Sequence, residues 1–233
     1  MEFTSVNKLF QEAFKKNWDR PAISNYQGMT LHYRDVARRV EKLHIMFEEC
    51  GLSVGDKVAI CSRNQANWAV SFLAAMTYGA VPVPLLHEFK SANIHHLVNH
   101  SEAKILFVDD VIWEGLSESE MPELQAIIQV NNFKILYAKD ESINEAKAHL
   151  NELFGRKYPE AFEADMLNYY EDSADELAVI NYTSGTSGFS KGVMIPYRAI
   201  LSNIQFGKKA LPQLDGSSRV VSMLPCAHMY GLM

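Results

Sequence analysis

Apolar and polar positions follow two spacings along this chain, and these spacings predict helices and strands in alternation. Apolar residues recur every three or four positions in several segments, as expected of helices that bury one side. These segments are residues 6–14, 33–50, 66–78, 91–100 and 143–155. Short apolar runs bounded by turn-forming residues predict strands at 58–62, 80–85, 104–110, 133–138 and 177–182. Residues 22–33 predict a hairpin that turns near Gly28.

Most of the predicted strands are separated by helical stretches of ten or more residues. This order favours parallel pairing with helices on both faces, so we expect an α/β fold of mainly parallel sheets flanked by helices. Glycine is placed to end two of the helices, at Gly51 and Gly155, and to form a turn at Gly79. The first helix is expected to turn one apolar side inward, formed by Val6, Leu9, Phe10 and Phe14.

Two regions give weaker patterns. Residues 111–132 favour neither helix nor strand, and the acidic residues 156–176 are expected to be a linker or irregular. The wider acidic stretch 140–176 is expected to be a solvated surface. Asp109 and Asp110 resemble a pair of catalytic carboxylates, but they end a predicted strand, where turn formation explains them better.

Composition narrows the class of protein. The chain has 233 residues, of which 48% are hydrophobic and 21% charged, as is ordinary for a globular protein of one or two domains. Its net charge is −6 and its basic residues are scattered, which argues against a nucleic-acid partner. The three cysteines lack a C-x-x-C spacing and predict reduced thiols in a cytoplasmic protein.

One apolar stretch, residues 68–86, is nearly long enough to cross a membrane. Gly79, Pro82 and Pro84 divide it, so it predicts a buried helix followed by a short strand and no transmembrane segment. The amino-terminal residues lack the apolar core of a signal peptide.

The segment YTSGTSGFSKGVMI, residues 182–195, combines small hydroxyl residues, glycines and one lysine. Glycines allow close approach of the backbone to a ligand, and backbone N–H groups, hydroxyls and an ammonium group together suit a phosphate chain. It is not a Walker loop, because Ser190 stands where a glycine belongs and Gly192 follows the lysine. The β-prone residues after Lys191 predict a loop between two strands, and Pro196 predicts the start of a helix. A flexible hairpin rich in turn residues is the alternative interpretation.

YTSGTSGFSKGV, residues 182–193, resembles the phosphate-binding signature of the adenylate-forming superfamily, [YF]-T-S-G-[ST]-[ST]-G-x-P-K-G-V. It departs from that pattern at Ser190, where proline is usual. Further matches follow in order along the chain: LHYRDV (31–36), GDKVAICSRNQANWAVSFLAAMTYGAVPVPL (55–85), HSEAKILFVDD (100–110), DELAVINYTSG (175–185) and LPCAHMYG (224–231). Residues 100–110 are most similar to acyl-CoA synthetases of the long-chain fatty acid type.

This resemblance implies a two-step reaction in which a carboxylate forms an acyl-adenylate with ATP and a thiol, usually that of CoA, then displaces AMP. Mg²⁺ is implied for the complete enzyme. The residues implied to bind the β- and γ-phosphates are Thr183, Ser184, Gly185, Thr186, Ser187, Gly188 and Lys191. His228 matches the histidine of the "LPxxHxxG" motif and would lie at the acyl pocket, as the catalytic candidate. The alternative is a histidine that ends a buried strand and is satisfied by the backbone.

Members of the superfamily are considerably longer than this chain. The resemblance therefore implies that residues 1–233 form one incomplete N-terminal AMP-binding domain, inactive by itself, and able to form oligomers through an apolar truncated face. Two alternatives stay open: a non-catalytic module that binds a phosphorylated ligand or a partner, and an amino-acid adenylation domain that feeds a carrier protein. His95, His96 and His100 have a spacing that suits a metal, but no nearby carboxylate completes a site, so no metal site is predicted.

Overall fold

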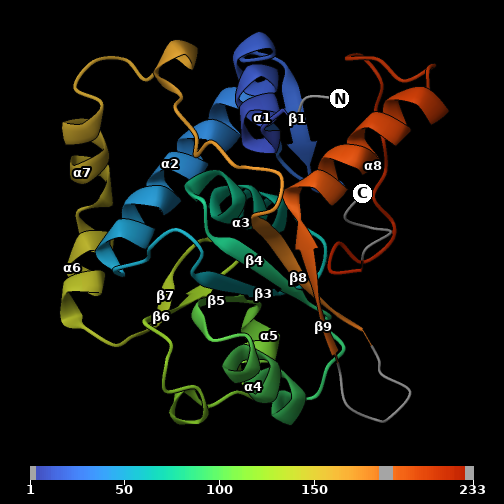
Figure 1. Ribbon diagram of the computed structural model, residues 1–233. Coiled ribbons are helices and arrows are strands. Elements are labelled where there is room, and N and C mark those ends of the chain that lie inside the picture. Colours follow the sequence, from blue (N-terminus) through green and yellow to red (C-terminus); the bar gives the residue numbers. More distant parts are fainter. Residues whose placement is uncertain (1–3, 184–190, 229–233) are drawn as a thin grey trace.

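A computed structural model describes residues 4–183 and 191–228 (Figure 1). Its centre is a five-stranded sheet in the order β4-β3-β5-β6-β7. The strands are β3 (Lys57–Cys61), β4 (Val81–Leu85), β5 (Ala103–Val108), β6 (Ala126–Gln129) and β7 (Ile135–Ala138). Two antiparallel pairs form separate sheets, β1 (Pro21–Ser24) with β2 (Thr30–His32), and β8 (Leu177–Thr183) with β9 (Lys191–Pro196). Strand β8 lies beside β4.

Helices cover both faces of the five-stranded sheet, as the sequence predicted (Figure 1). One face packs against α2 and α3, and the other against α4. The helices are α1 (Val6–Lys16), α2 (Tyr33–Glu49), α3 (Ala66–Tyr78), α4 (Ser91–His100), α5 (Asp110–Trp113), α6 (Glu141–Ala148), α7 (Leu150–Lys157) and α8 (Tyr197–Ala210), with 3₁₀ turns at Glu118–Glu120 and Ala164–Met166. The strands are apolar on both sides because both sides are buried.

Parallel pairing holds for four neighbouring strands, β4, β3, β5 and β6. The exception is β7, which runs antiparallel to β6. The two are joined only by residues 130–134, a connection too short for the crossover that a parallel neighbour needs. The mainly parallel α/β fold is therefore confirmed, with an antiparallel strand at one edge.

Gly79 ends α3 and begins the turn into β4, as predicted. Its φ of +87° lies in the left-handed region that favours glycine. A Cβ atom at this position would lie 2.8 Å from the ring of Tyr170, so the space is also closed to a side chain. The apolar stretch 68–86 is thus a buried helix, a glycine turn and a buried strand. Among the described residues, no helix combines the length and the apolar character that crossing a membrane requires.

The prediction of one helix over residues 143–155 is wrong. The chain forms two helices, α6 and α7, which meet at His149, and Gly155 lies inside α7 instead of ending it. The break lets both helices pack against α2, with Leu150 and Phe154 buried in the core. The tertiary contacts therefore outweigh the continuous helical pattern.

The buried side of α1 also differs from the prediction. Val6 and Phe14 are buried and Phe10 is partly buried, but Leu9 is exposed. Asn7 and Gln11 are buried in its place, because each has a polar partner. The Asn7 side chain donates to the carbonyl oxygen of Met76 at 2.9 Å, and Gln11 Oε1 accepts from the backbone N–H of Tyr169 at 2.8 Å.

The stretch 156–176, predicted to be a linker or irregular, begins with the last two residues of α7. Residues 158–176 are irregular apart from one 3₁₀ turn, but they are not merely a solvated surface. Phe162, Leu167 and Tyr169 are buried in the main core. Asp172 is buried too, and its carboxylate accepts hydrogen bonds at the start of α1. The stretch therefore fastens α1 to the rest of the fold.

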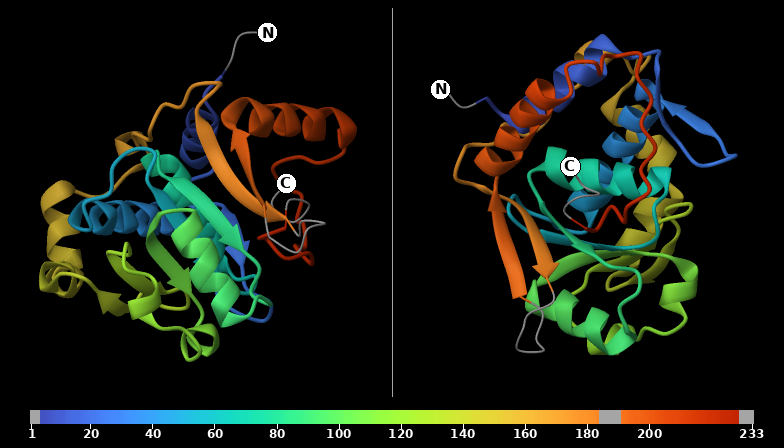
Figure 2. Two further views of the ribbon diagram at one scale, coloured as in Figure 1. Left: turned by 60° about the horizontal axis from the view of Figure 1, so that its bottom comes forward. Right: turned by 90° about the vertical axis from the view of Figure 1, so that its right-hand side faces the viewer.

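Apolar side chains are exposed around and beyond α8, which lies beside α1 in both views of Figure 2. An open cavity of about 450 Å³ lies between α1, α3 and α8, lined mainly by apolar residues such as Phe10, Phe72 and Ile204. Phe206, within α8, and Val221, in the segment that follows it, are also largely exposed. Exposed apolar surface was expected from the resemblance, and self-association through it stays a prediction.

Candidate functional site

Two paired strands, β8 and β9, flank residues 184–190 of the candidate phosphate-binding segment, and a strand was predicted on each side. In the antiparallel register, Tyr182 is opposite Gly192 and Thr183 is opposite Lys191. Thr183 and Lys191, two of the predicted phosphate-binding residues, are thus neighbours on paired strands, and both are exposed. The other predicted residues, Ser184, Gly185, Thr186, Ser187 and Gly188, lie outside the described residues.

Helix α8 follows β9 directly. Pro196 is the last residue of β9 and precedes the helix, which begins at Tyr197 instead of at the proline itself. Tyr197 is buried and receives a hydrogen bond at its hydroxyl from Asn7 Nδ2 at 3.3 Å. The start of α8, where the chain leaves the candidate site, is therefore held against α1.

The sides of β8 face different neighbours, because side chains alternate along a strand. Asn181 is buried and its Nδ2 atom donates to the carbonyl oxygen of Ala227 at 3.0 Å. Tyr182, the next residue, is directed to α4, where its hydroxyl lies 2.7 Å from His100 Nδ1. Burial raises the pKa of the Tyr182 hydroxyl, which is therefore neutral at physiological pH.

His228 lies in a turn, where its backbone N–H donates to the carbonyl oxygen of Pro225 at 2.9 Å. It is exposed and does not end a buried strand, so that alternative interpretation of His228 is wrong. Asn64 holds the same segment from the other side. Its Nδ2 atom donates to the carbonyl oxygen of Leu224 at 2.6 Å, and its Oδ1 atom accepts from the N–H of Cys226 at 2.8 Å.

Asn64, Asn181 and His100 were not among the predicted site residues. Asn181 could have been noticed as a polar residue inside the apolar run 177–182. For Asn64 and His100 the sequence gives no signal, because their partners lie more than 80 positions away.

Asp109 was assigned to a turn, and it does precede α5. Its carboxylate also accepts from Arg63 N and from Gln65 Nε2, each at 2.9 Å, which joins the ends of β3 and β5.

The residues present at this strand pair suit phosphate better than a metal ion. Thr183 supplies a hydroxyl and Lys191 an ammonium group, both of which can donate to phosphate oxygens. Mg²⁺ is usually bound through carboxylate groups and phosphate oxygens, and neither β8 nor β9 contains a carboxylate. The strand pair therefore offers Mg²⁺ no carboxylate, and the ion enters no step of the reaction proposed below.

The three histidines around α4 have other contacts. His95 Nε2 accepts the backbone N–H of Ser117 at 3.1 Å, and the rings of His96 and His100 are 5.8 Å apart between centroids. Within the described part of the chain, no group of three or more His, Cys, Asp or Glu side chains is arranged to hold a metal ion. The cysteines are free thiols, as predicted, and burial raises the pKa of Cys50 and of Cys61 to about 12.

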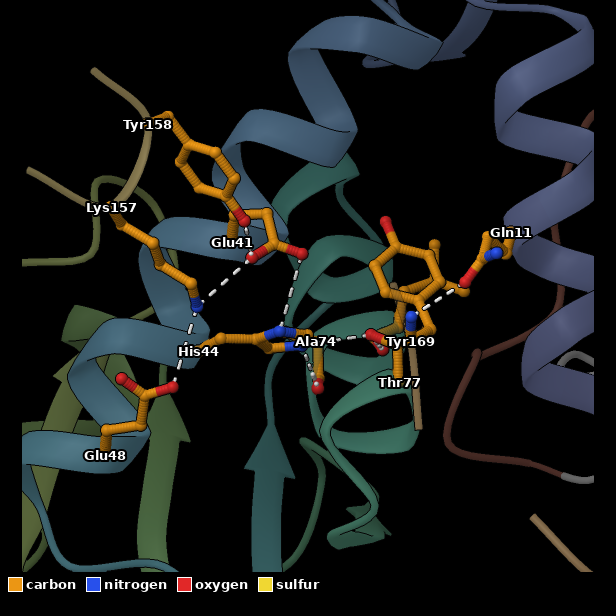
Figure 3. Close-up of polar contacts among 10 residues, drawn as sticks. Gln11, Glu41, His44, Glu48, Ala74, Thr77, Lys157, Tyr158 and Tyr169 are labelled. Carbon is orange, nitrogen blue, oxygen red and sulfur yellow. Dashed lines mark hydrogen bonds and ion pairs between the residues drawn. The ribbon is translucent and has the colours of Figure 1, made fainter. Parts of the chain in front are cut away.

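A separate group of ionisable side chains lies between α2, α3 and α7, and its members Glu41 and His44 are buried (Figure 3). Glu41 accepts a hydrogen bond from the Tyr158 hydroxyl at 2.6 Å, and Lys157 Nζ lies 3.5 Å from the same carboxylate. His44 Nε2 donates to the carbonyl oxygen of Ala74 at 3.1 Å. Burial lowers the pKa of His44, although the Glu41 carboxylate acts in the opposite direction. We assign this group a structural role, because it connects three helices of the core.

Comparison with known proteins identifies the family to which this arrangement belongs. Residues 10–233 match the family described as AMP-binding enzyme. The chain therefore belongs to the AMP-binding enzyme family, and its resemblance to the adenylate-forming superfamily is confirmed.

The relatives are longer than this chain. The long-chain-fatty-acid–CoA ligase of Salmonella typhimurium is 25% identical over 99% of this chain and 44% of the ligase. Surfactin synthase subunit 2 of Bacillus subtilis is 25% identical over 85% of this chain and 5% of that protein. Among solved structures, apo MatB from Rhodopseudomonas palustris shares the fold with a TM-score of 0.74 and 20% identity, over 98% of this chain and 42% of MatB. The chain thus spans less than half the length of each of these proteins. It corresponds to the N-terminal part of typical members of the superfamily.

Proposed function

We propose that this chain supplies the phosphate-binding part of an AMP-forming acid–thiol ligase that activates a carboxylic acid, in particular a fatty acid, and transfers it to CoA. The observation that carries the proposal is the pairing of Thr183 with Lys191 at the ends of β8 and β9. It places a hydroxyl and a cation side by side where the family has its phosphate signature. The fatty acid is suggested by the long-chain-fatty-acid–CoA ligases of Salmonella typhimurium and Cavia porcellus, which are 25% and 28% identical to the matched residues.

In the proposed first step, an oxygen of the substrate carboxylate attacks the α-phosphorus of ATP, and the bond from that phosphorus to the bridging oxygen breaks. The products are acyl-adenylate and pyrophosphate. Negative charge builds on the leaving pyrophosphate, where Lys191 and Thr183 would donate hydrogen bonds. In the second step the thiol of CoA gives up its proton to solvent, its sulfur bonds to the acyl carbon, and the bond from that carbon to the phosphate oxygen breaks, so that AMP leaves. His228 would lie at the acyl group, held there by the contacts of Asn64 and Asn181 with residues 224–227.

Part of the machinery for this reaction is expected from the rest of a complete AMP-binding domain, since relatives of more than twice this length carry the activity in their names. We therefore expect residues 1–233 to bind the triphosphate of ATP and to form no acyl-adenylate alone. Solved relatives with the same fold include MatB with ATP bound, with a TM-score of 0.73 and 22% identity.

The proposal is tested by calorimetric titration of the chain with ATP, tripolyphosphate and inorganic phosphate. We expect ATP and tripolyphosphate to compete for one site, and inorganic phosphate to compete weakly. Lys191→Ala should weaken binding of both about tenfold or more, because it removes a charge-assisted hydrogen bond. Lys134→Ala removes an exposed lysine of the turn before β7 and should leave binding unchanged. Equal binding by the Lys191→Ala variant would contradict the assignment.

A second candidate is an amino-acid adenylation domain, which is favoured by the match to surfactin synthase subunit 2. The two candidates differ in the acid that they activate. ATP–pyrophosphate exchange, measured with a complete AMP-binding domain that includes this chain, should depend on fatty acids for the ligase and on amino acids for the alternative. A third candidate is a non-catalytic module for phosphorylated ligands, for which inorganic phosphate should compete as well as tripolyphosphate.

A further inference from the structure

Tyr182 is the first residue of the candidate phosphate-binding segment and the last buried residue of β8, and it connects β8 with α4 and β9. Its side chain is 6% exposed, and its ring meets the His100 ring edge to face, with the centroids 5.7 Å apart. The hydroxyl oxygen lies 2.7 Å from His100 Nδ1, at the last residue of α4. Figure 1 and the right view of Figure 2 both show the ends of β8 and β9 that flank residues 184–190 next to α4.

The ring of Tyr182 also covers Gly192 on the neighbouring strand. The two residues are opposite each other in the register. A Cβ atom at Gly192 would lie 3.2 Å from Cε1 and 3.4 Å from Cζ of Tyr182, and 3.2 Å from Cγ2 of Ile180. Such distances are tighter than ordinary packing, so the tyrosine ring occupies the space that a side chain on Gly192 would need.

These contacts make one continuous connection from α4, through His100 and Tyr182, to Gly192 on β9. The next residue pair along the two strands is Thr183 and Lys191. Both are exposed, and nothing in their own side-chain burial fixes their strands. Strand β8 lies beside β4 of the five-stranded sheet. The pair Tyr182 and Gly192, with its buried tyrosine ring and bonded hydroxyl, is the last anchored pair before Thr183 and Lys191.

We propose that His100 is a positioning residue, which acts through Tyr182 to hold Thr183 and Lys191 in place for the phosphates of ATP. This inference rests on the proposed function for its ligand. His100 does not itself touch the phosphates. It fixes the orientation of the Tyr182 ring, and the ring keeps β9 close to β8 where the two phosphate-binding residues leave the strands. His100 thereby receives a role that no recognised motif of the chain assigns to it.

The test uses His100→Ala, Tyr182→Phe, the double variant, and two further variants for comparison. Tyr182→Phe removes the hydroxyl and keeps the ring over Gly192. His100→Gln keeps a hydrogen-bonding side chain and should restore part of the effect. His96→Ala is the matched control, because His96 lies one turn earlier on α4 and contacts the ring of His100 but makes no hydrogen bond to Tyr182.

The first measurement is amide hydrogen exchange at Thr183, Lys191 and Val193, which needs no ligand. Exchange at these amides should be several times faster in His100→Ala and in Tyr182→Phe than in the unchanged chain, with no further increase in the double variant. The His96→Ala chain should exchange at the original rate. Unchanged exchange in both single variants, or effects that add fully in the double variant, would overturn the proposal.

The second measurement is the dissociation constant for ATP. We expect His100→Ala and Tyr182→Phe each to weaken binding about threefold to tenfold, as the loss of one hydrogen bond does. The melting temperature, followed in parallel, separates this effect from general destabilisation, which His96→Ala and His100→Ala would share. If ATP does not bind the unchanged chain, the proposed function fails, while coupled exchange at Thr183 and Lys191 would still support the positioning role.

Discussion

The Oδ1 atom of Asp172 lies 2.8 Å from the backbone nitrogen of Asn7, although 165 positions separate the two residues in the chain. The same carboxylate accepts from Ser5 Oγ at 2.7 Å and from the N–H of Val6 at 3.0 Å. The first amides of a helix have no partner inside the helix, and a negative charge at that end is favourable. Asp172 therefore acts as a distant cap for α1.

Replacing Asp172 by alanine should destabilise the protein by about 2–4 kcal/mol, because it leaves buried amides at the start of α1 without an acceptor. Asp172→Asn keeps the shape and one acceptor oxygen, so its cost should be smaller. Chemical denaturation of both variants measures the difference in the free energy of unfolding. A cost below about 1 kcal/mol for the alanine variant would show that water replaces the carboxylate.

Two glycines of this chain should respond to alanine in opposite ways. Gly79 has a φ of +87° and faces the Tyr170 ring, so Gly79→Ala should cost about 2 kcal/mol or more through backbone strain and steric overlap. Gly155 lies inside α7 with open space around its Cα, so Gly155→Ala should stabilise by about 0.5–1 kcal/mol. Thermal unfolding of both variants checks the pair, and destabilisation by the Gly155 substitution would contradict the helix observed there.

These two glycines also show what sequence reasoning can and cannot predict. Gly79 follows an apolar helix and precedes an apolar strand, and both neighbours give local signals. Gly155 also follows a helical pattern of apolar residues, and this local signal predicted a helix end there. Its helix continues because Phe154 is buried on α2 and the real break falls at His149. When tertiary packing decides where a helix is interrupted, the sequence around the interruption carries no local signal of it.

The candidate site likewise has features that the sequence predicts and contacts that only the structure shows. The two strands around residues 184–190 could be predicted from the sequence, but the register that pairs Thr183 with Lys191 comes from the structure. The contacts that fix the site do not follow from the sequence either. Asn64 contacts residues 160 positions later, and His100 contacts Tyr182, 82 positions later. Such contacts depend on the finished fold.

The buried His44 predicts a dependence of stability on pH. Burial lowers the pKa of His44 in the folded protein below its usual value of about 6.5. The unfolded chain therefore binds a proton more readily in the range below pH 6.5, so the free energy of unfolding should fall as the pH falls through this range. Well above pH 6.5, from about pH 7.5, the histidine is neutral in both states and the dependence should disappear.

Unfolding measured with urea between pH 5.5 and pH 7.5 tests this prediction. Charged and titratable groups that surround His44 are Glu41, Glu48 and Lys157, together with the hydroxyls of Tyr78 and Tyr169. His44→Gln, which retains a donor for the Ala74 carbonyl group, should flatten the profile. His149→Gln, at an exposed histidine, is the control and should leave the profile unchanged. A profile that is flat in the unchanged chain would show that Glu41 stabilises the charged form of His44 enough to cancel the effect of burial.

Lys191 should matter for rate as well as for binding. In a complete AMP-binding domain that includes this chain, Lys191→Ala should slow ATP–pyrophosphate exchange by roughly ten- to a hundredfold. This range corresponds to the loss of a charge-assisted hydrogen bond of about 1.5–3 kcal/mol to the leaving pyrophosphate. Lys134→Ala should leave the rate unchanged. An unchanged exchange rate in the Lys191 variant would remove this lysine from the reaction.

The segment that carries His228 should depend on Asn64 for its position. Asn64 both donates to Leu224 and accepts from Cys226, so Asn64→Ala removes two contacts at once. Amide exchange at Cys226 should then be faster. Asn64→Asp keeps the acceptor for the Cys226 amide and loses the donor, so exchange at Cys226 should rise less. If both variants leave this amide unchanged, the contact of Asn181 with Ala227 is sufficient to hold the turn, and Asn181→Ala should then expose it.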